Sequence, residues 1–150
     1  NAAVLILDNR TTGMTGHQPN PATGRDIHCE PTTEIDLPTL CRACGVEKVT
    51  SVDAFDLPGL ESALRDAMAH KGPAVVIARR ACALLDKRRD KPLYTVHRDK
   101  CVGCMNCMRL GCPAIEKDGK KTRINPELCV GCGLCADVCR FSAIQKEAER

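Results

Sequence analysis

The stretch CVGCMNCMRLGC occupies residues 101–112, and the stretch CVGCGLCADVC follows it at residues 129–139. In each stretch two residues separate the first cysteine from the second and the second from the third. Four residues separate the third cysteine from the fourth in the first stretch, and three separate them in the second. Three thiols on one short loop, with a fourth just beyond it, form the ligand pattern of a cubane iron–sulfur cluster. Two such runs in tandem predict two 4Fe-4S clusters and a role in electron transfer.

The spacing also predicts which cysteines share a cluster. In the two-cluster ferredoxin pattern the fourth cysteine of one run binds the cluster of the other run. We therefore assign one cluster to Cys101, Cys104, Cys107 and Cys139, and the other to Cys129, Cys132, Cys135 and Cys112. Gly103, Gly131 and Gly133 allow backbone N–H groups to approach the cluster sulfides closely. The expected apolar jacket consists of Val102, Met105, Leu110, Ile115, Val130, Leu134, Phe141 and Ile144.

Two departures from the ferredoxin pattern leave an alternative to be weighed. The first run carries an extra residue before Cys112, and Arg140 stands where a proline would follow Cys139. An inserted residue bulges the loop but removes no ligand. The alternative is a pair of structural zinc sites, but zinc ribbons use separated two-cysteine knuckles, whereas three cysteines share each loop here.

Residues 99–150 contain an internal repeat that predicts a small α+β ferredoxin-like domain. Besides the cysteines, the pair Ala114-Ile115 returns as Ala143-Ile144, which implies two equivalent halves. Between the two runs, Asp118-Gly119 is typical of a hairpin turn and is flanked by short polar strands.

Residues 1–80 predict an α/β layer with a parallel sheet. Strands are expected at residues 4–7, 46–52 and 74–78, the first of them buried on both faces because it is uniformly apolar. Asp36 and Asp56 each precede Leu-Pro and predict helix N-caps. The first helix carries Cys41 and Cys44 on its apolar side, which favours buried inert thiols over a redox pair. The apolar face of the second helix comprises Leu57, Leu60, Leu64, Ala67 and Met68.

Composition limits the remaining function classes. The net charge of +3 is too small to indicate nucleic-acid binding, and no apolar run is long enough to cross a membrane. Without an export signal, the 12 cysteines are expected to be free thiols in the cytoplasm. Because the chain starts almost inside its first strand, we expect it to be the C-terminal part of a longer protein. Residues 81–98 form a basic linker, or alternatively a docking surface for an acidic electron carrier.

The segment between Leu7 and Asp36 has no clear periodicity, and a loop of this length in an α/β layer is usually functional. It leaves the carboxyl end of a parallel strand, where open sheets bind ligands. Its oxygen donors suit Mg²⁺ and its glycines suit phosphates, although an ordinary surface loop fits the same residues.

Residues 7–18, LDNRTTGMTGHQ, resemble the end of the thiamine-diphosphate signature of the 2-oxoacid:ferredoxin oxidoreductases, in particular the indolepyruvate type. The resemblance continues through Ile77–Arg80 and Cys82 to the cysteine runs. It implies that Asn9 gives a side-chain oxygen and Thr11 a backbone carbonyl to the Mg²⁺ of thiamine diphosphate. Cofactor and substrate would be lined by Thr15, Gly16, His17 and Gln18, with His17 a candidate catalytic proton donor.

The same resemblance implies oxidative decarboxylation of an aryl 2-oxoacid to an acyl-coenzyme A, with electrons passing through two clusters to an external ferredoxin. A smaller catalytic (beta) subunit is the implied partner. This chain alone is expected to be inactive, because the family's first Mg²⁺ ligand and the glutamate that activates thiamine lie in parts absent here. One alternative is an electron-transfer module whose residues 1–80 are only a scaffold; another is a relative acting on pyruvate or 2-oxoglutarate.

Overall fold

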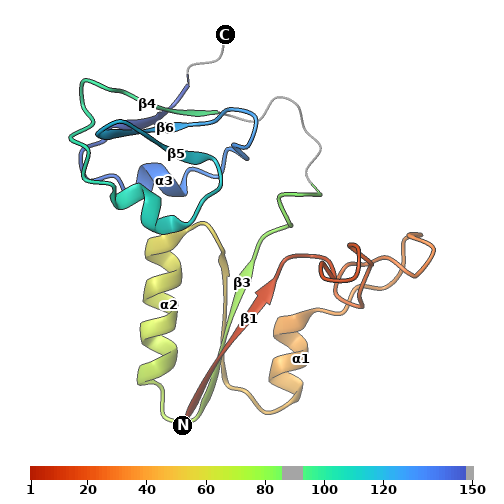
Figure 1. Ribbon diagram of the computed structural model, residues 1–150. Coiled ribbons are helices and arrows are strands. Elements are labelled where there is room, and N and C mark those ends of the chain that lie inside the picture. Colours follow the sequence, from red (N-terminus) through yellow and green to blue (C-terminus); the bar gives the residue numbers. More distant parts are fainter. Residues whose placement is uncertain (86–92, 148–150) are drawn as a thin grey trace. The chain divides into compact units, whose positions relative to one another are not determined.

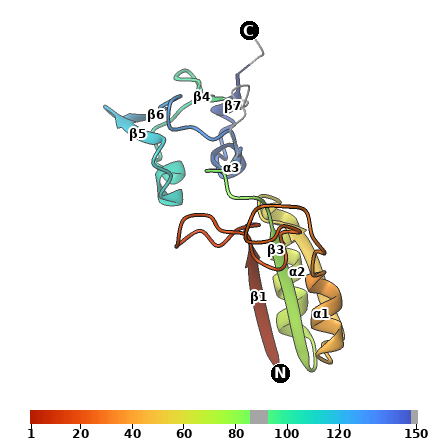
Figure 2. The same ribbon diagram turned by 90° about the vertical axis from the view of Figure 1, so that its right-hand side faces the viewer.

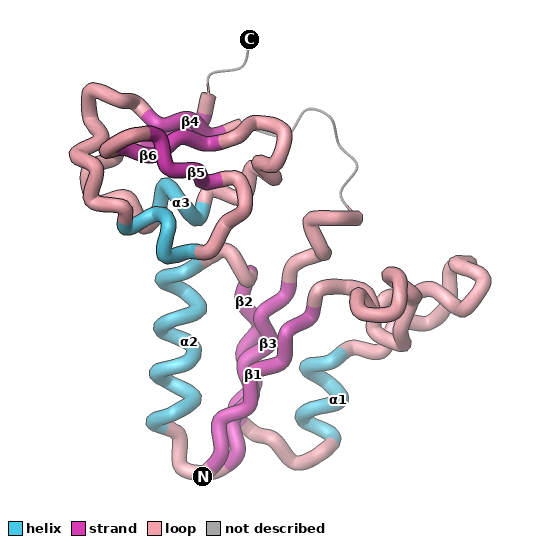
Figure 3. Tube along the Cα trace, in the orientation of Figure 1, coloured by secondary structure: helices cyan, strands magenta, loops and turns pink. Residues whose placement is uncertain are grey.

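The computed structural model describes residues 1–85 and 93–147, and it divides into two compact units, Asn1–Lys87 and Arg88–Arg150 (Figure 1). Each unit is described by itself. The tube in Figure 3 shows the contrast between them: the first has strands accompanied by helices, and the second has short strands joined by long loops. No helix in the described part of the chain is long and apolar enough to cross a membrane.

The first unit is built on a three-stranded parallel sheet, as the sequence predicts. Its strands are β1 (Ala2–Asp8), β2 (Lys48–Asp53) and β3 (Pro73–Arg79), in the order β1-β3-β2. Leu7 pairs with Ala78 and Val52 pairs with the same residue from the other side, so all three strands end together. The carboxyl ends Asp8, Asp53 and Arg79 therefore form one charged edge.

Two helices accompany the sheet, and both begin where the Asp-Leu-Pro signals predict. Helix α1 (Leu37–Ala43) is capped by Asp36, whose Oδ2 accepts from the N–H of Thr39 at 2.8 Å. Helix α2 (Leu57–Ala69) is capped by Asp56, which accepts from Gly59 at 3.1 Å. In Figure 1 the two helices lie to either side of the strands, and Figure 2 shows the same strands from the side.

The core of this unit lies between α2 and the central strand. Ala63, Ala67, Ala74 and Val76 are buried together, with Val52, Leu60 and Leu64 packed against them. The prediction that Met68 belongs to this face was wrong, since its side chain is 76% exposed. It follows the buried residue Ala67 directly, and consecutive residues of a helix point about 100° apart.

Two further expectations for this unit were wrong. The first strand is not buried on both faces, because β1 is an edge strand that pairs only with β3, and Leu7 is 74% exposed. The thiols of α1 are not buried either: Cys44 is exposed and Cys41 half-buried, since α1 contributes no buried residue to the core. A uniformly apolar strand does not distinguish an edge position from a central one.

The second unit contains two small antiparallel pairs. The hairpin predicted around Asp118-Gly119 is present as β5 (Ile115–Asp118) and β6 (Lys121–Ile124). The other pair joins β4 (Tyr94–Val96) to β7 (Ile144–Lys146), so residues 94–96 of the predicted linker form a strand of this unit. The remaining residues of that linker include 86–92, which lie outside the described part. A 3-10 helix (Asn106–Leu110) contains the third cysteine of the first run, and α3 (Leu134–Asp137) contains the third cysteine of the second.

Candidate cofactor sites

Two cavities of the second unit gather the eight cysteines of the two runs. The first cavity is lined by Cys101, Cys104, Cys107 and Cys139, together with Val96, Thr122, Phe141 and Ile144 among others. The second is lined by Cys112, Cys129, Cys132 and Cys135, together with Tyr94, Ile115, Ile124 and Leu134 among others. Each cavity thus receives three thiols from one run and the fourth from the other. This is the grouping that the spacing predicts.

The loops that present these thiols need glycine at defined places. Gly103 has φ of +75°, and a Cβ atom there would lie 2.2 Å from the backbone oxygen of Lys120. Gly133 has φ of +84°, and a Cβ there would lie 2.8 Å from the Tyr94 hydroxyl. Gly103 excludes a side chain on steric grounds as well as by conformation, because the atom it would meet is backbone. At Gly133 the positive φ disfavours a side chain, and the Tyr94 hydroxyl would have to move. These contacts are with protein atoms, so the close approach of the backbone to the cluster sulfides that is expected at Gly103, Gly131 and Gly133 stays a prediction.

The donor chemistry of the two cavities differs. Burial raises the pKa of Cys135 to about 11, and the neighbouring thiols of Cys132 and Cys129 add to the shift. At Cys101 burial also opposes ionisation, but hydrogen bonds from the backbone of Gly103 and Thr122 and the charge of Lys121 together lower its pKa below the usual value. Several thiolates in one buried space repel one another, so a cationic centre is needed to hold them all ionised. Iron in a cluster is such a centre.

The thiols surround each cavity instead of converging on one point. In the described ranges no three His, Cys, Asp or Glu side chains lie close enough to share a single metal ion, and all the cysteines are free. A zinc ion draws its four ligands to about 2.3 Å from one centre. A cubane cluster has four iron atoms that each take one sulfur, and the four thiols that line each cavity match that number.

The predicted apolar jacket is only partly present. Ile115 and Ile144 are buried, at 8% and 4% exposure, and Met105 and Leu134 are half-buried. The prediction was wrong for a group of residues that lie between 38% and 61% exposed, namely Val102, Leu110, Val130 and Phe141. Val102, Val130 and Phe141 lie in irregular parts of the chain, where no strand or helix period fixes the direction of a side chain, and Leu110 is the last residue of the 3-10 helix.

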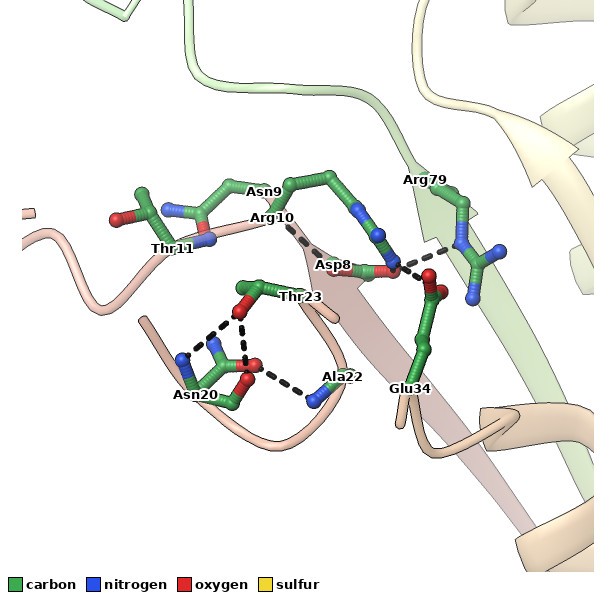
Figure 4. Close-up of polar contacts among 9 residues, drawn as sticks. All are labelled: Asp8, Asn9, Arg10, Thr11, Asn20, Ala22, Thr23, Glu34 and Arg79. Carbon is green, nitrogen blue, oxygen red and sulfur yellow. Dashed lines mark hydrogen bonds and ion pairs between the residues drawn. The ribbon is translucent and has the colours of Figure 1, made fainter. Parts of the chain in front are cut away.

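The second candidate site is the turn that follows β1, drawn in Figure 4. Asp8, only 8% exposed, accepts from the backbone N–H of Arg10 at 3.0 Å and from Nε of Arg79 at 2.8 Å. Arg10 in turn donates to Glu34 at 2.7 Å. Hydrogen bonding to Glu34 raises the pKa of Arg10. A non-glycine residue with positive φ is held in place by its surroundings, and Arg10 has φ of +60°.

The oxygen donors predicted to bind Mg²⁺ lie together in this turn. Asn9 Oδ1 accepts from the N–H of Thr11 at 3.2 Å, and the Thr11 hydroxyl donates to the carbonyl of Gln18 at 3.3 Å. The backbone oxygen of Asn9 accepts from Cys82 at 2.9 Å. Thr11 is buried at 6% exposure. An amide oxygen and a carbonyl oxygen on one rigid turn fit a hard cation such as Mg²⁺.

A second turn lies beside the first and is closed by its own polar contacts. Asn20 Oδ1 accepts from the N–H of Ala22 at 3.0 Å, and the Thr23 hydroxyl donates to the Asn20 carbonyl at 2.7 Å (Figure 4). Asx-type turns of this kind give a long loop a fixed shape without helix or strand.

The remaining loop residues of the prediction separate into two places. Thr15, Gly16 and Gln18 are exposed at the tip, where the Thr15 hydroxyl donates to Gln18 Oε1 at 2.5 Å. His17, with Thr11, lines a cavity of about 240 Å³ that also includes Arg10, Arg25 and Cys29.

Sequence reasoning found no partner for Cys82, but its Sγ lies 3.9 Å from Nε2 of His17. Asp8 and Arg79 were also missed as site residues, although a charged residue at the last position of an apolar strand is a signal that could have identified them.

Comparison with known proteins agrees with this division. A family model described as "Thiamine pyrophosphate enzyme, C-terminal TPP binding domain" matches residues 1–78, and one described as "4Fe-4S binding domain" matches residues 122–145. The chain is 41% identical over 158 residues to the indolepyruvate oxidoreductase subunit IorA of Pyrococcus horikoshii, covering 99% of this chain and 24% of that protein. It is 42% identical to the subunit of the same name from Archaeoglobus fulgidus, covering 95% of this chain and 24% of that protein.

A shorter match involves the cysteine-rich part alone. The pyruvate synthase subunit PorD of Thermotoga maritima is 42% identical over 57 residues, which cover 36% of this chain and 57% of that protein. The chain spans about a quarter of the length of the indolepyruvate oxidoreductase subunits, at 24%. The matched model covers more than half of the chain and ends at the carboxyl edge of the sheet, where the turn of Asp8 and Asn9 lies. The chain therefore belongs to the thiamine pyrophosphate enzyme family, and residues 1–78 are its C-terminal TPP binding domain.

Proposed function

We propose that this chain is part of a 2-oxoacid:ferredoxin oxidoreductase that acts on aryl 2-oxoacids of the indolepyruvate type. The observation that carries the proposal is the combination, in one chain, of an oxygen-rich turn at the end of a parallel sheet and two cavities with four thiols each. The relatives named indolepyruvate oxidoreductase match across both parts. The PorD match covers only the part with the cysteines and so supports the electron-transfer role without the substrate.

Thiamine diphosphate, when bound, supplies the electron sink for the loss of CO₂ from a 2-oxoacid. In this chain the side-chain oxygen of Asn9 and the carbonyl of Thr11 would hold the Mg²⁺ that carries its diphosphate. The exposed residues Thr15, Gly16 and Gln18 would meet the rest of the cofactor from the loop tip. His17, which lines a cavity of the same loop, would hold or donate a proton on the substrate side.

The electrons of the oxidation need one-electron carriers. The first cavity would hold a 4Fe-4S cluster on Cys101, Cys104, Cys107 and Cys139, and the second would hold another on Cys112, Cys129, Cys132 and Cys135. An external ferredoxin would accept the electrons, and coenzyme A would accept the acyl group. A smaller beta subunit would complete the enzyme, which we place in the cytoplasm.

The test is cofactor analysis and turnover of the full-length protein with its partner subunit. We expect eight iron and eight sulfide per chain from two cubanes, bound thiamine diphosphate, and coenzyme A-dependent reduction of a viologen dye with indolepyruvate or another aryl 2-oxoacid. Faster turnover with pyruvate or 2-oxoglutarate would move the proposal to that substrate. Zinc in place of iron, or an absence of thiamine diphosphate, would contradict it.

A second candidate function is an electron-transfer module without its own catalysis. The second unit favours this candidate because it has its own buried core, which includes Cys107, Ile115, Cys135 and Ile144. The thiamine diphosphate measurement distinguishes the two functions. If residues 1–80 are only a scaffold for an electron-transfer module, the protein would purify with iron–sulfur clusters and without thiamine diphosphate. Turnover of His17→Ala in the full complex tests the catalytic role of that residue.

A further inference from the structure

The two cluster cavities differ at positions that the repeat makes equivalent. In the hairpin, Ile115 pairs with Ile124 and Lys117 pairs with Thr122. In the other strand pair, Ile144 pairs with Val96 and Lys146 pairs with Tyr94. Since Ala114-Ile115 repeats as Ala143-Ile144, the register makes Thr122 the counterpart of Tyr94, and Ile124 the counterpart of Val96.

The strands β6 and β4 each contribute lining residues to both cavities, and these residues lie two positions apart along the strand. Thr122 lines the first cavity and Ile124, two positions along β6 on the same face, lines the second. On β4 the order is reversed, with Val96 lining the first cavity and Tyr94 the second. From β4 and β6 together, each cavity thus receives one apolar residue and one residue with a hydroxyl group. The hydroxyl belongs to a threonine in the first cavity and to a tyrosine in the second.

The threonine hydroxyl meets a cluster thiol directly. Thr122 is buried at 3% exposure, and its Oγ1 lies 3.5 Å from Sγ of Cys107. Its neighbour Lys121 brings a positive charge near Cys101. In the second cavity the Tyr94 hydroxyl lies against Gly133, and the negative charge of Asp137 is nearby. No hydroxyl-to-thiol hydrogen bond is present there in the ranges that the structure describes.

Cluster reduction adds a negative charge, so the groups around the sulfurs set the potential. Hydrogen bonds to the sulfurs, nearby charge and solvent exposure are the terms that tune it. All three favour the first cavity. It has the Thr122 hydroxyl, the charge of Lys121 and an exposed thiol at Cys104, whereas the equivalent thiol of the second cavity, Cys132, is half-buried. Each cavity also has one buried thiol, so these do not distinguish the two.

We propose that the buried hydroxyl of Thr122 makes the cluster held by Cys101, Cys104, Cys107 and Cys139 the more easily reduced of the two. This deepens the proposed function, since it rests on two clusters being bound. An electron that enters this part of the protein is then held on the first cluster, so electron transfer between the two clusters runs from the second to the first. Thr122 is a positioning residue, because its hydroxyl would stabilise the added negative charge of the reduced cluster through the sulfur of Cys107.

The test is an equilibrium redox titration of the full-length protein, followed by EPR, with dithionite as reductant and no 2-oxoacid. In the wild type we expect two potentials. In Cys104→Ser the altered EPR signal should be the one that is reduced first, which identifies the first cluster. In Thr122→Val, which is isosteric, we expect about a tenfold fall in the reduced-to-oxidised ratio of the first cluster at fixed potential, equal to about 59 mV for one electron. In Thr122→Ser, which keeps the hydroxyl, the potential should stay near that of the wild type.

The control is Tyr94→Phe, which should leave the first cluster unchanged. Three results would overturn the proposal: equal potentials in the wild type, assignment of the higher potential to the second cluster, or equal shifts in Thr122→Val and Thr122→Ser. The wild-type measurement decides the order of the two clusters even if Thr122→Val loses iron. Because no substrate is used, failure of the proposed enzyme activity would show separately in the turnover assay.

Discussion

The ion pair between Asp8 and Arg79 should hold the turn that carries the proposed Mg²⁺ ligands, and replacing Asp8 with alanine tests this. The Asp8 side chain is 6% exposed and that of Arg79 35%, with 2.8 Å between Oδ2 and Nε. The same carboxylate accepts from the N–H of Arg10 at 3.0 Å. The variant therefore removes the partners of two donors, and a lost hydrogen bond to a charged group costs about 2 kcal/mol at such a site.

The structure supplies a matched control on the neighbouring strand. Asp53 ends β2 as Asp8 ends β1, pairs with Arg80 through two contacts of 2.8 Å, and accepts from the N–H of Phe55 at 2.8 Å. Its side chain, however, is 47% exposed and that of Arg80 44%. Exposed pairs are screened by water and contribute about 0.5 kcal/mol. Asp53→Ala should therefore cost much less than Asp8→Ala.

Two measurements on the full-length protein check this reasoning. Chemical denaturation should show a lower unfolding midpoint for Asp8→Ala than for Asp53→Ala. Calorimetric titration with thiamine diphosphate and Mg²⁺ should show an affinity up to about thirtyfold weaker for Asp8→Ala, since 1.4 kcal/mol corresponds to a factor of ten. Asp53→Ala should bind as the wild type does. If both variants lose stability and affinity equally, burial is not what distinguishes the pairs and the reasoning is refuted.

Three further predictions concern the second unit. Cys112→Ser should disturb the cluster bound by the second run and leave the other intact by EPR, whereas loss of the first run's cluster would contradict the crossed grouping. Gly103→Ala should lower iron content strongly because its Cβ would meet a backbone oxygen at 2.2 Å, while Gly119→Ala, with φ of +63° but open space, should retain iron. In the cluster-free protein at pH 8, iodoacetamide should modify Cys101 faster than Cys135, whose pKa of about 11 leaves about one thiol in a thousand ionised; equal rates would contradict the burial of Cys135.

Local signals in the sequence predicted most of the first unit's elements. The Asp-Leu-Pro signals at Asp36 and Asp56 mark both helix starts because a cap is a contact between residues three apart. The strands follow from short apolar runs. The sequence could not predict that β1 lies at an edge, because strand order depends on which segments pair across the chain. The same limit explains Cys44, whose exposure depends on what covers α1.

The candidate sites show a similar division. Cysteine spacing agrees with the grouping of thiols in both cavities, because three thiols of each cavity lie on one short loop and the ferredoxin pattern assigns the fourth to the other run. The contact of His17 with Cys82 joins residues 65 positions apart, and the ion pair of Asp8 with Arg79 joins residues 71 apart. Such contacts require the register of β1 on β3, which places Asp8 opposite Arg79.

The residues that distinguish the two cluster cavities lie outside the repeated cysteine runs. Thr122 belongs to the strand between the runs, and Tyr94 belongs to a strand before the first run. Spacing alone therefore predicts two clusters without saying how these strands make their surroundings differ. Only the pairing of β4 with β7 and of β5 with β6 identifies the two residues as counterparts. In the proposed function the duplicated cysteine loops would set the number of clusters, and the unduplicated strands beside them would make the two clusters differ. Exchanging the two residue types, as Thr122→Tyr with Tyr94→Thr, should for this reason narrow the difference between the two potentials, since the charge of Lys121 and the exposed thiol of Cys104 stay in place.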